Sequence, residues 1–117
     1  MKKIYYLSTC DTCKRILKEV DAPVSYERQD IKQDPVTEEQ LEELRKYTDS
    51  YEELFSKRAR LYKERGLKDK DLSEEDIKKL ILEHYTFLKR PIIVKDKSIF
   101  IGNSKKTVAE AKKNIHE

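Results

Sequence analysis

The sequence Cys10-Asp11-Thr12-Cys13 constrains this chain more than any other feature. It lies between the apolar run Ile4-Tyr5-Tyr6-Leu7 and a helix-forming stretch that starts near Lys14, and it holds both cysteines of the 117-residue chain. A thiol at a strand-to-helix junction lies beside the unsatisfied N–H groups of a helix start, which favour the thiolate and lower the cysteine pKa. We therefore expect thiol chemistry at the first turn of the first helix.

The composition fits a single globular domain over residues 1–117. Charged residues make up 42% of the chain and apolar residues 37%, so we expect a lean core under an ionic surface. The 26 Lys and Arg residues nearly balance the 23 Asp and Glu residues, which does not predict direct binding to nucleic acid. No apolar stretch reaches the ~20 residues of a membrane span, and none has the length of a secretory signal. We expect a cytoplasmic protein, where a cysteine pair is typical of catalysis, redox sensing or metal binding.

The order of the predicted elements indicates an α/β fold. Hydrophobic periodicity and turn residues predict strands at 3–8, 24–28, 91–94 and 99–101, and helices at 13–21, from Thr37 to near Tyr47, through much of 49–85, and at 105–115. Ser8 or Thr9 is expected to cap the first helix, and Val24 and Tyr26 are expected to share one face of the second strand. The order βαβ, helical block, ββα predicts a thioredoxin-like four-stranded mixed sheet. Its core would span about 1–33 and 86–117, with a central helical insertion at about 36–85.

Within this fold Cys10 is the candidate nucleophile, because it lies nearer the strand end and the following amides point at it. Cys13, one helical turn later, can resolve a mixed disulfide, and Lys14 and Arg15 add positive charge nearby. Two other interpretations stay open. The pair could be half of a zinc site, although the two histidines of the chain lie far along it, or a pair of inert buried cysteines.

Arg90-Pro91 is the second candidate feature. Proline can start a strand without loss of a central hydrogen bond, and in thioredoxin-like folds this position commonly holds a cis peptide that faces the active cysteine. Arg90 would then lie near Cys10, where it can bind an oxyanion or a carboxylate. Arg58, in the charged cluster 57–60, is a further candidate, although a charged run is more often a solvated surface.

The chain resembles the arsenate reductase (ArsC)/Spx family over essentially its whole length. The resemblance rests on residues 8–15 around the cysteines, on Phe55-Ser56-Lys57-Arg58, on Leu88-Lys89-Arg90-Pro91-Ile92-Ile93-Val94, and on the hairpin that ends at Ile101-Gly102-Asn103. It implies the same thioredoxin-like fold with a helical insertion.

The resemblance implies two different functions. In the arsenate reductase branch a cysteine attacks an oxyanion held by three arginines, and glutathione with glutaredoxin supplies the electrons. Carried over, Cys10 is the nucleophile and Arg90 and Arg58 are oxyanion ligands, but Gly102-Asn103-Ser104 stands where the third arginine is expected, and Cys13 replaces the usual serine. In the Spx branch the cysteine pair is the redox switch of a transcription factor that binds the RNA polymerase α subunit, through a loop with glycine where this chain has Ser50.

We therefore expect a thiol-dependent oxidoreductase that acts on a small oxyanion or a disulfide. It would need no metal and no bound organic cofactor, and glutathione or a glutaredoxin would be its electron donor. The alternative is an Spx-like redox-sensing regulator that binds the C-terminal domain of the RNA polymerase α subunit. A third possibility is a reductase of the family without arsenate specificity.

Overall fold

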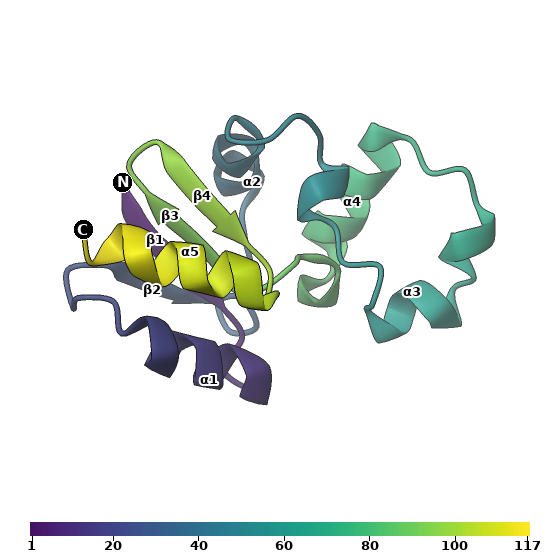
Figure 1. The fold of residues 1–117 in the computed structure, drawn as a ribbon. Coiled ribbons are helices and arrows are strands. Elements are labelled where there is room, and N and C mark those ends of the chain that lie inside the picture. The colour runs from purple at the N-terminus through teal and green to yellow at the C-terminus, as the bar shows by residue number, and fades with distance from the viewer. The chain divides into compact units, whose positions relative to one another are not determined.

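A four-stranded mixed sheet organises the N-terminal and C-terminal parts of the chain (Figure 1). The computed structural model describes residues 1–117, which divide into a first unit, Met1–Asp34 with Arg90–Glu117, and a second unit, Pro35–Lys89. The strands are β1 (Lys2–Tyr6), β2 (Glu27–Asp30), β3 (Ile92–Lys95) and β4 (Ser98–Ile101). Their order is β2-β1-β3-β4, with β1 parallel to β2 and antiparallel to β3, and β3 antiparallel to β4. The predicted α/β fold with a mixed sheet is confirmed.

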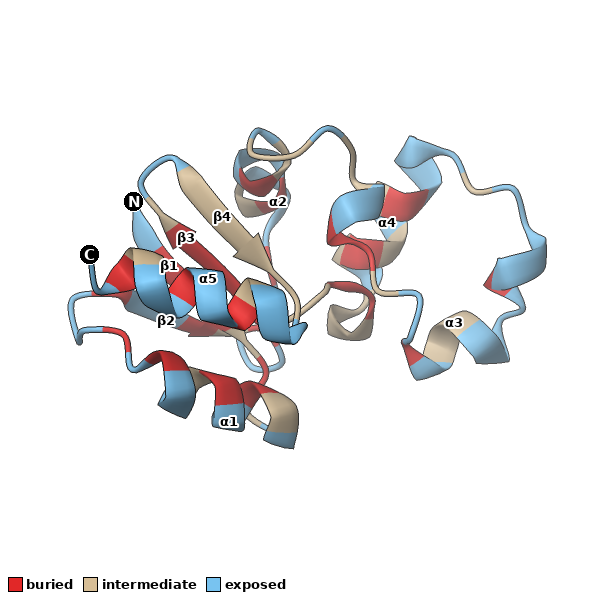
Figure 2. Cartoon of the chain, viewed as in Figure 1, coloured by how far each residue is buried: buried red, intermediate tan, exposed pale blue.

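Helices α1 (Asp11–Val20) and α5 (Lys105–Ile115) pack against each other and cover one face of this sheet (Figure 1). Their inward faces are buried, as Figure 2 shows in red. The core beneath them consists of Ile4, Ile16, Val20, Ala22, Tyr26, Ile93, Val108, Ala111 and Ile115. Full burial of one such aliphatic side chain contributes roughly 1.5–3 kcal/mol. This core fixes the position of α1, and with it the position of the cysteines at the start of α1.

The second unit consists of short helical segments, where the sequence predicts helix from Thr37 to near Tyr47 and through much of 49–85. They are α2 (Glu38–Arg45), α3 (Arg60–Glu64) and α4 (Glu74–Glu83), with 3₁₀ turns at Glu52–Leu54, Leu67–Asp69 and Tyr85–Phe87. Phe55 and Phe87 stack with ring centroids 5.6 Å apart. The backbone around Phe55 also pairs with the segment before β3, since Ser56 N donates to Phe87 O at 2.7 Å and Lys89 N donates to Leu54 O at 2.8 Å. These contacts hold the segment around Phe55 against the segment that precedes β3, within the second unit.

Capping boxes start α2 and α4, the first of them at Thr37, where the sequence predicts a helix to begin. Thr37 Oγ1 accepts a hydrogen bond from Gln40 N, and the Gln40 side chain accepts one from Thr37 N, both at 3.1 Å. Ser73 and Asp76 form the same reciprocal pair at the start of α4. Such boxes satisfy N–H groups that have no partner within the helix, so they define where a helix begins.

The second strand begins later than the sequence predicts. The expectation of a strand at 24–28 is wrong in its first half, because β2 starts at Glu27 and Tyr26 N closes a turn onto Pro23 O at 3.0 Å. Val24 is 97% exposed and Tyr26 is 3% exposed, so the two do not share a strand face. A proline-led turn thus produced the same apolar spacing as a short strand.

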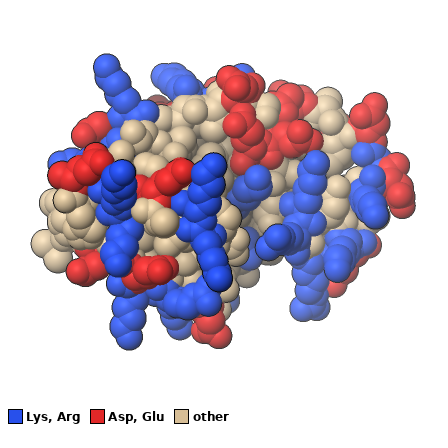
Figure 3. Space-filling model, viewed as in Figure 1, with Lys and Arg blue, Asp and Glu red and all other residues tan.

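Charged side chains of both signs cover the face seen in Figure 3. Some form close ion pairs, such as Arg65 with Glu83 at 2.7 Å and Lys78 with Glu42 at 2.8 Å. Exposed pairs of this kind contribute at most about 1 kcal/mol each, so the buried cores carry most of the stability. None of the helices combines the length and the apolar character that crossing a membrane requires.

Replacement of the Ser73 cap should destabilise the second unit. We expect Ser73→Ala to lower the free energy of unfolding by about 1 kcal/mol, because the N–H of Asp76 loses its acceptor. Urea denaturation followed by circular dichroism measures the change. Ser25→Ala, at an exposed serine in the turn before β2, is the control and should stay within about 0.5 kcal/mol of the parent. Equal losses for both variants would contradict the assignment of the cap.

Candidate active site

Cys10 lies where the chain leaves β1 and begins α1. The connection is a tight turn in which Cys10 N donates to Leu7 O at 3.1 Å. Cys10 has an extended backbone, with φ −97° and ψ 112°, and it is the N-cap residue of α1. The expectation that Ser8 or Thr9 caps this helix is therefore wrong. The Cys10 thiol occupies the position where a polar N-cap side chain would otherwise accept hydrogen bonds from the free N–H groups of the first helical turn.

The pKa of the Cys10 thiol is lowered from its ordinary value of 9.0. Partial burial is the largest single influence and acts to raise this pKa, but the stabilising contacts together outweigh it. The backbone N–H and the thiol of Cys13, the guanidinium of Arg90 and the N–H of Thr12 all favour the thiolate. No side-chain hydrogen bond of standard geometry caps the helix. The two amides thus act on the sulfur as nearby dipoles at the helix start.

Cys13 has the opposite electrostatics. It is fully buried, and burial is the main reason that its pKa is raised to about 11. The charge of the Cys10 thiolate and the hydrogen bond that the Cys13 thiol donates to it raise the pKa further, while the N–H of Leu7 and the guanidinium of Arg90 act against the rise. At neutral pH the pair therefore combines a Cys10 sulfur whose thiolate is favoured with a Cys13 thiol that stays protonated, one turn along the same helix face.

Arg90 and Pro91 lead into β3 beside the cysteines. The Arg90–Pro91 peptide is cis, and Pro91 is buried with its carbonyl accepting a hydrogen bond from Gly102 N at 2.9 Å. The half-buried Arg90 lies close enough to lower the pKa of both thiols. The structure thus brings together Cys10, Cys13 and Arg90, although about 80 residues separate the arginine from the cysteines in the sequence.

Arg58 belongs to the second unit. It is exposed on the turn Lys57–Arg58 that precedes α3, rather than on a helix. Its neighbour Lys57 forms an ion pair with Glu52 at 3.2 Å. A role for Arg58 beside Cys10 stays a prediction.

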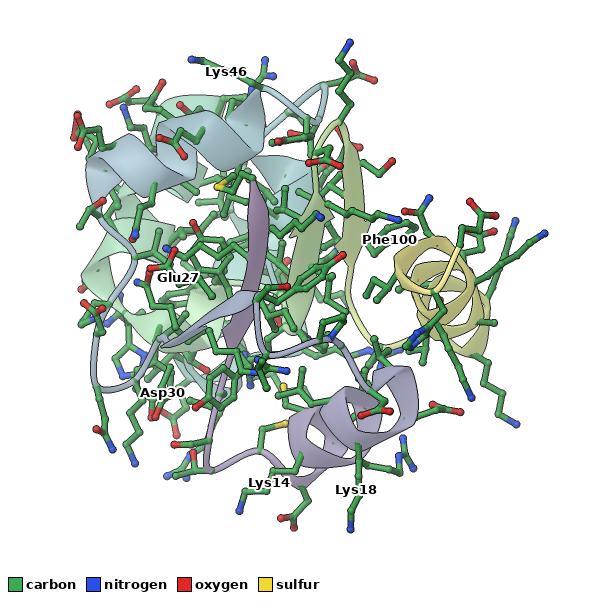
Figure 4. All side chains as sticks on the ribbon, turned by 90° about the vertical axis from the view of Figure 1, so that its left-hand side faces the viewer. Lys14, Lys18, Glu27, Asp30, Lys46 and Phe100 are labelled. Carbon is green, nitrogen blue, oxygen red and sulfur yellow. The ribbon has the colours of Figure 1, made fainter.

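One contact at the site escaped the sequence analysis. The carboxylate of Asp30, at the end of β2, holds the turn that leads to Cys10: Oδ2 accepts from Ser8 Oγ at 2.5 Å and Oδ1 accepts from Ser8 N at 3.3 Å. Asp30 lies beside this connection in Figure 4. Only the pairing of β2 with β1 reveals the contact, because the residues are 22 positions apart and form no motif.

Beyond the exposed Asp11, three basic side chains gather on the surface of α1. Lys14, Arg15 and Lys18 surround the half-buried Leu17 on α1 and line a shallow open hollow. Figure 4 shows Lys14 and Lys18 extending outward from this helix. An anionic group that approaches the thiol would meet a favourable field. No group of three or more His, Cys, Asp or Glu side chains is arranged to hold a metal ion.

A family model described as the ArsC family matches residues 5–111. The chain belongs to the ArsC family. Its cysteine pair, its buried cis-proline and the arginine before that proline all lie within the matched residues.

Proteins similar to this chain carry two kinds of name. "Global transcriptional regulator Spx 1" of Bacillus cereus is 28% identical over 106 residues, which cover 87% of this chain and 79% of that protein. The solved structure of arsenate reductase from Vibrio cholerae has a TM-score of 0.71 at 23% identity and covers 94% of this chain and 96% of that one. A solved structure of a Staphylococcus aureus COL protein has a TM-score of 0.71 at 30% identity, with 94% and 97% covered. These likenesses confirm the thioredoxin-like fold.

Loss of the Arg90 charge should make Cys10 less reactive at neutral pH. We expect Arg90→Gln to raise the pKa of Cys10 towards 9.0, and to slow its alkylation by iodoacetamide about threefold or more at pH 7. The pH profile of alkylation, resolved by peptide mass spectrometry, measures this shift. Arg15→Gln removes an equal charge from α1 that is not among the main influences on the pKa of Cys10, and its profile should lie much closer to that of the parent than the profile of Arg90→Gln. Identical profiles for Arg90→Gln and the parent would refute the electrostatic role of Arg90.

Proposed function

We propose that this ArsC family member is a thiol-dependent oxidoreductase, with Cys10 as nucleophile and Cys13 as resolving thiol. The observation that carries the proposal is the opposite shift of the two pKa values within one helical turn. An attacking thiol has to be a thiolate at working pH, and a resolving thiol has to stay protonated until the first step has occurred. An accidental pair of buried cysteines would not need one member to be half-exposed and stabilised as an anion.

In the proposed reaction the Cys10 thiolate attacks one sulfur of a substrate disulfide. A mixed disulfide forms, and the other substrate sulfur leaves as a thiolate that takes up a proton. Cys13 then loses its proton, attacks Cys10 Sγ and displaces the second substrate sulfur as a thiol. The substrate gains two electrons and two protons, and the Cys10–Cys13 pair becomes a disulfide. Two glutathione molecules, or a glutaredoxin dithiol, return the electrons and become oxidised.

The electrostatics of Cys13 support this order of steps. Its pKa is raised in part by the negative charge on Cys10 and by the hydrogen bond to it. Both influences disappear once Cys10 is bound in a mixed disulfide, because its sulfur is then neutral. Cys13 thus becomes easier to deprotonate at the step where its thiolate is needed.

The basic surroundings favour an anionic substrate or partner. Arg90 lies beside the thiol, and the exposed face of α1 adds Lys14, Arg15 and Lys18. A small oxyanion such as arsenate would need several guanidinium groups, and Arg90 and Arg58 are the two candidates, since Gly102-Asn103-Ser104 follows β4 where a third arginine is expected. We therefore propose a disulfide with anionic groups as the better substrate, in a reducing cytoplasmic environment.

Two cysteine variants test this proposal. Diamide should convert the parent to a Cys10–Cys13 disulfide, seen by mass spectrometry as a loss of two hydrogens. In an assay coupled to glutathione and glutaredoxin, the parent should reduce small disulfides, and Cys10→Ser should abolish turnover. Cys13→Ser should instead accumulate a mixed disulfide on Cys10, because the second attack is missing. Two free thiols after diamide, or equal turnover by Cys10→Ser, would overturn the proposal.

A second candidate function is a redox-sensing transcriptional regulator. It is favoured by relatives that carry the name global transcriptional regulator Spx, such as the Bacillus cereus protein, whose match covers 87% of this chain. Cys10 and Cys13 would then form a sensor without turnover, and the partner would be the C-terminal domain of the RNA polymerase α subunit.

A pull-down with the purified polymerase domain separates the two functions. A regulator should capture the domain with an affinity that changes between the reduced and the diamide-oxidised chain, and Cys10→Ser should remove this dependence on oxidation. An oxidoreductase should show turnover and no such capture. Redox-dependent capture without turnover would replace the first function by the second.

A further inference from the structure

The turn Leu7–Cys10 determines where the Cys10 sulfur lies relative to α1. It is closed by the hydrogen bond from Cys10 N to Leu7 O, with Ser8 and Thr9 at its two central positions. The backbone of Cys10 then enters α1, where Lys14 N donates to Cys10 O at 3.1 Å. A rotation of this turn would move the sulfur away from the N–H groups of Thr12 and Cys13, which favour its thiolate.

Asp30 ties this turn to the neighbouring strand. Its two carboxylate oxygens accept hydrogen bonds from both the hydroxyl and the N–H of Ser8, and Oδ1 also accepts from Lys32 N at 3.2 Å. The next residue extends the link, since Ile31 N donates to Tyr6 O at 2.9 Å. One carboxylate thus holds Ser8, one of the two central residues of the turn, at both its hydroxyl and its N–H. The carboxylate comes from a strand that pairs with β1 in a register that places Tyr6 opposite Asp30.

Asp30 is not among the main electrostatic influences on Cys10. Besides burial, the largest contributions to the pKa of Cys10 come from Cys13, Arg90 and Thr12. A carboxylate that did act through space would raise a thiol pKa, because like charges repel. Asp30 can therefore favour the Cys10 thiolate only by holding the turn, and with it the Cys10 sulfur, in place.

We propose that Asp30, acting through Ser8, is a positioning residue that holds the Cys10 sulfur in line with the amides at the start of α1. This deepens the proposed function and rests on Cys10 as its nucleophile, but it concerns the state of the thiol and can be measured without any substrate. The hydrogen bond from Ser8 also lowers the pKa of Asp30, so the carboxylate is ionised throughout the range in which the thiol works.

Three effects of Asp30→Ala can be told apart by sign. A positioning role predicts that the pKa of Cys10 rises. A through-space effect of the charge predicts that it falls. A role in stability alone predicts that the unfolding midpoint drops while the pKa of Cys10 in the folded protein stays the same.

The experiment measures the rate of Cys10 alkylation against pH in the reduced full-length chain, with circular dichroism to show that each variant is folded. Asp30→Ala should slow alkylation at pH 7 by about threefold or more, since each pKa unit changes the thiolate fraction about tenfold below the pKa. Ser8→Ala and Asp30→Asn keep part of the contact, so both should lie between the parent and Asp30→Ala. The double variant Asp30→Ala/Ser8→Ala should be alkylated no more slowly than Asp30→Ala alone, because the two residues act as one unit.

Asp34→Ala is the matched control, because it removes an exposed carboxylate four residues further on that takes no part in holding the turn. Its alkylation profile should equal that of the parent. An unchanged or faster rate in folded Asp30→Ala, or additive effects of Asp30 and Ser8, would overturn the proposal. If Asp30→Ala does not fold, the same comparison of Ser8→Ala and Asp30→Asn with the control decides it. Absence of turnover in the coupled assay, with the pKa shift present, would refute the proposed function and leave the positioning role intact.

Discussion

The first turn of α1 presents its free N–H groups to a single sulfur atom, and the chemistry of the first unit depends on this alignment. Partial burial of Cys10 opposes ionisation, and by itself it would raise the pKa of the thiol above its ordinary value. The amides of Thr12 and Cys13, the Cys13 thiol and Arg90 reverse that outcome only because they act together. The spacing of two residues between the cysteines matters for the same reason, since it places the second thiol one turn along the helix, buried and protonated.

The sheet assembles this site from three separate segments. β1 delivers the turn and Cys10, the segment before β3 delivers the guanidinium of Arg90, and the end of β2 delivers the carboxylate that holds the turn. All three lie in the first unit, whose α1–α5 layer and core keep the helix start in place. The site thus depends on the pairing of β1 with both neighbours, and a loss of either pairing would remove a component that the thiolate needs.

The cysteine pair, Arg90 and the four-stranded mixed sheet could be predicted from the sequence, because their signals are local: a strand followed by a helix, a proline at a strand start, and a hairpin before the last helix. The contact between Ser8 and Asp30 could not, because it spans 22 residues and depends on the register of two parallel strands. Some predictions from local sequence patterns differ from the structure. The spacing of Val24 and Tyr26 arises from a turn at Pro23. The charged middle segment, predicted as helix through much of 49–85, holds short helices separated by 3₁₀ turns and by the bridge between Phe55 and Leu88.

A ¹³C NMR titration of the Cβ atoms of both cysteines in one reduced sample tests the central claim most directly, because it follows each thiol without any reagent. The account predicts that Cys10 titrates first, below 9.0, and that Cys13 titrates last, near 11. It also predicts that methylation of Cys10 lowers the pKa of Cys13, because the neighbouring negative charge is then gone. Two cysteines that titrate together at the ordinary value, or Cys13 before Cys10, would contradict it.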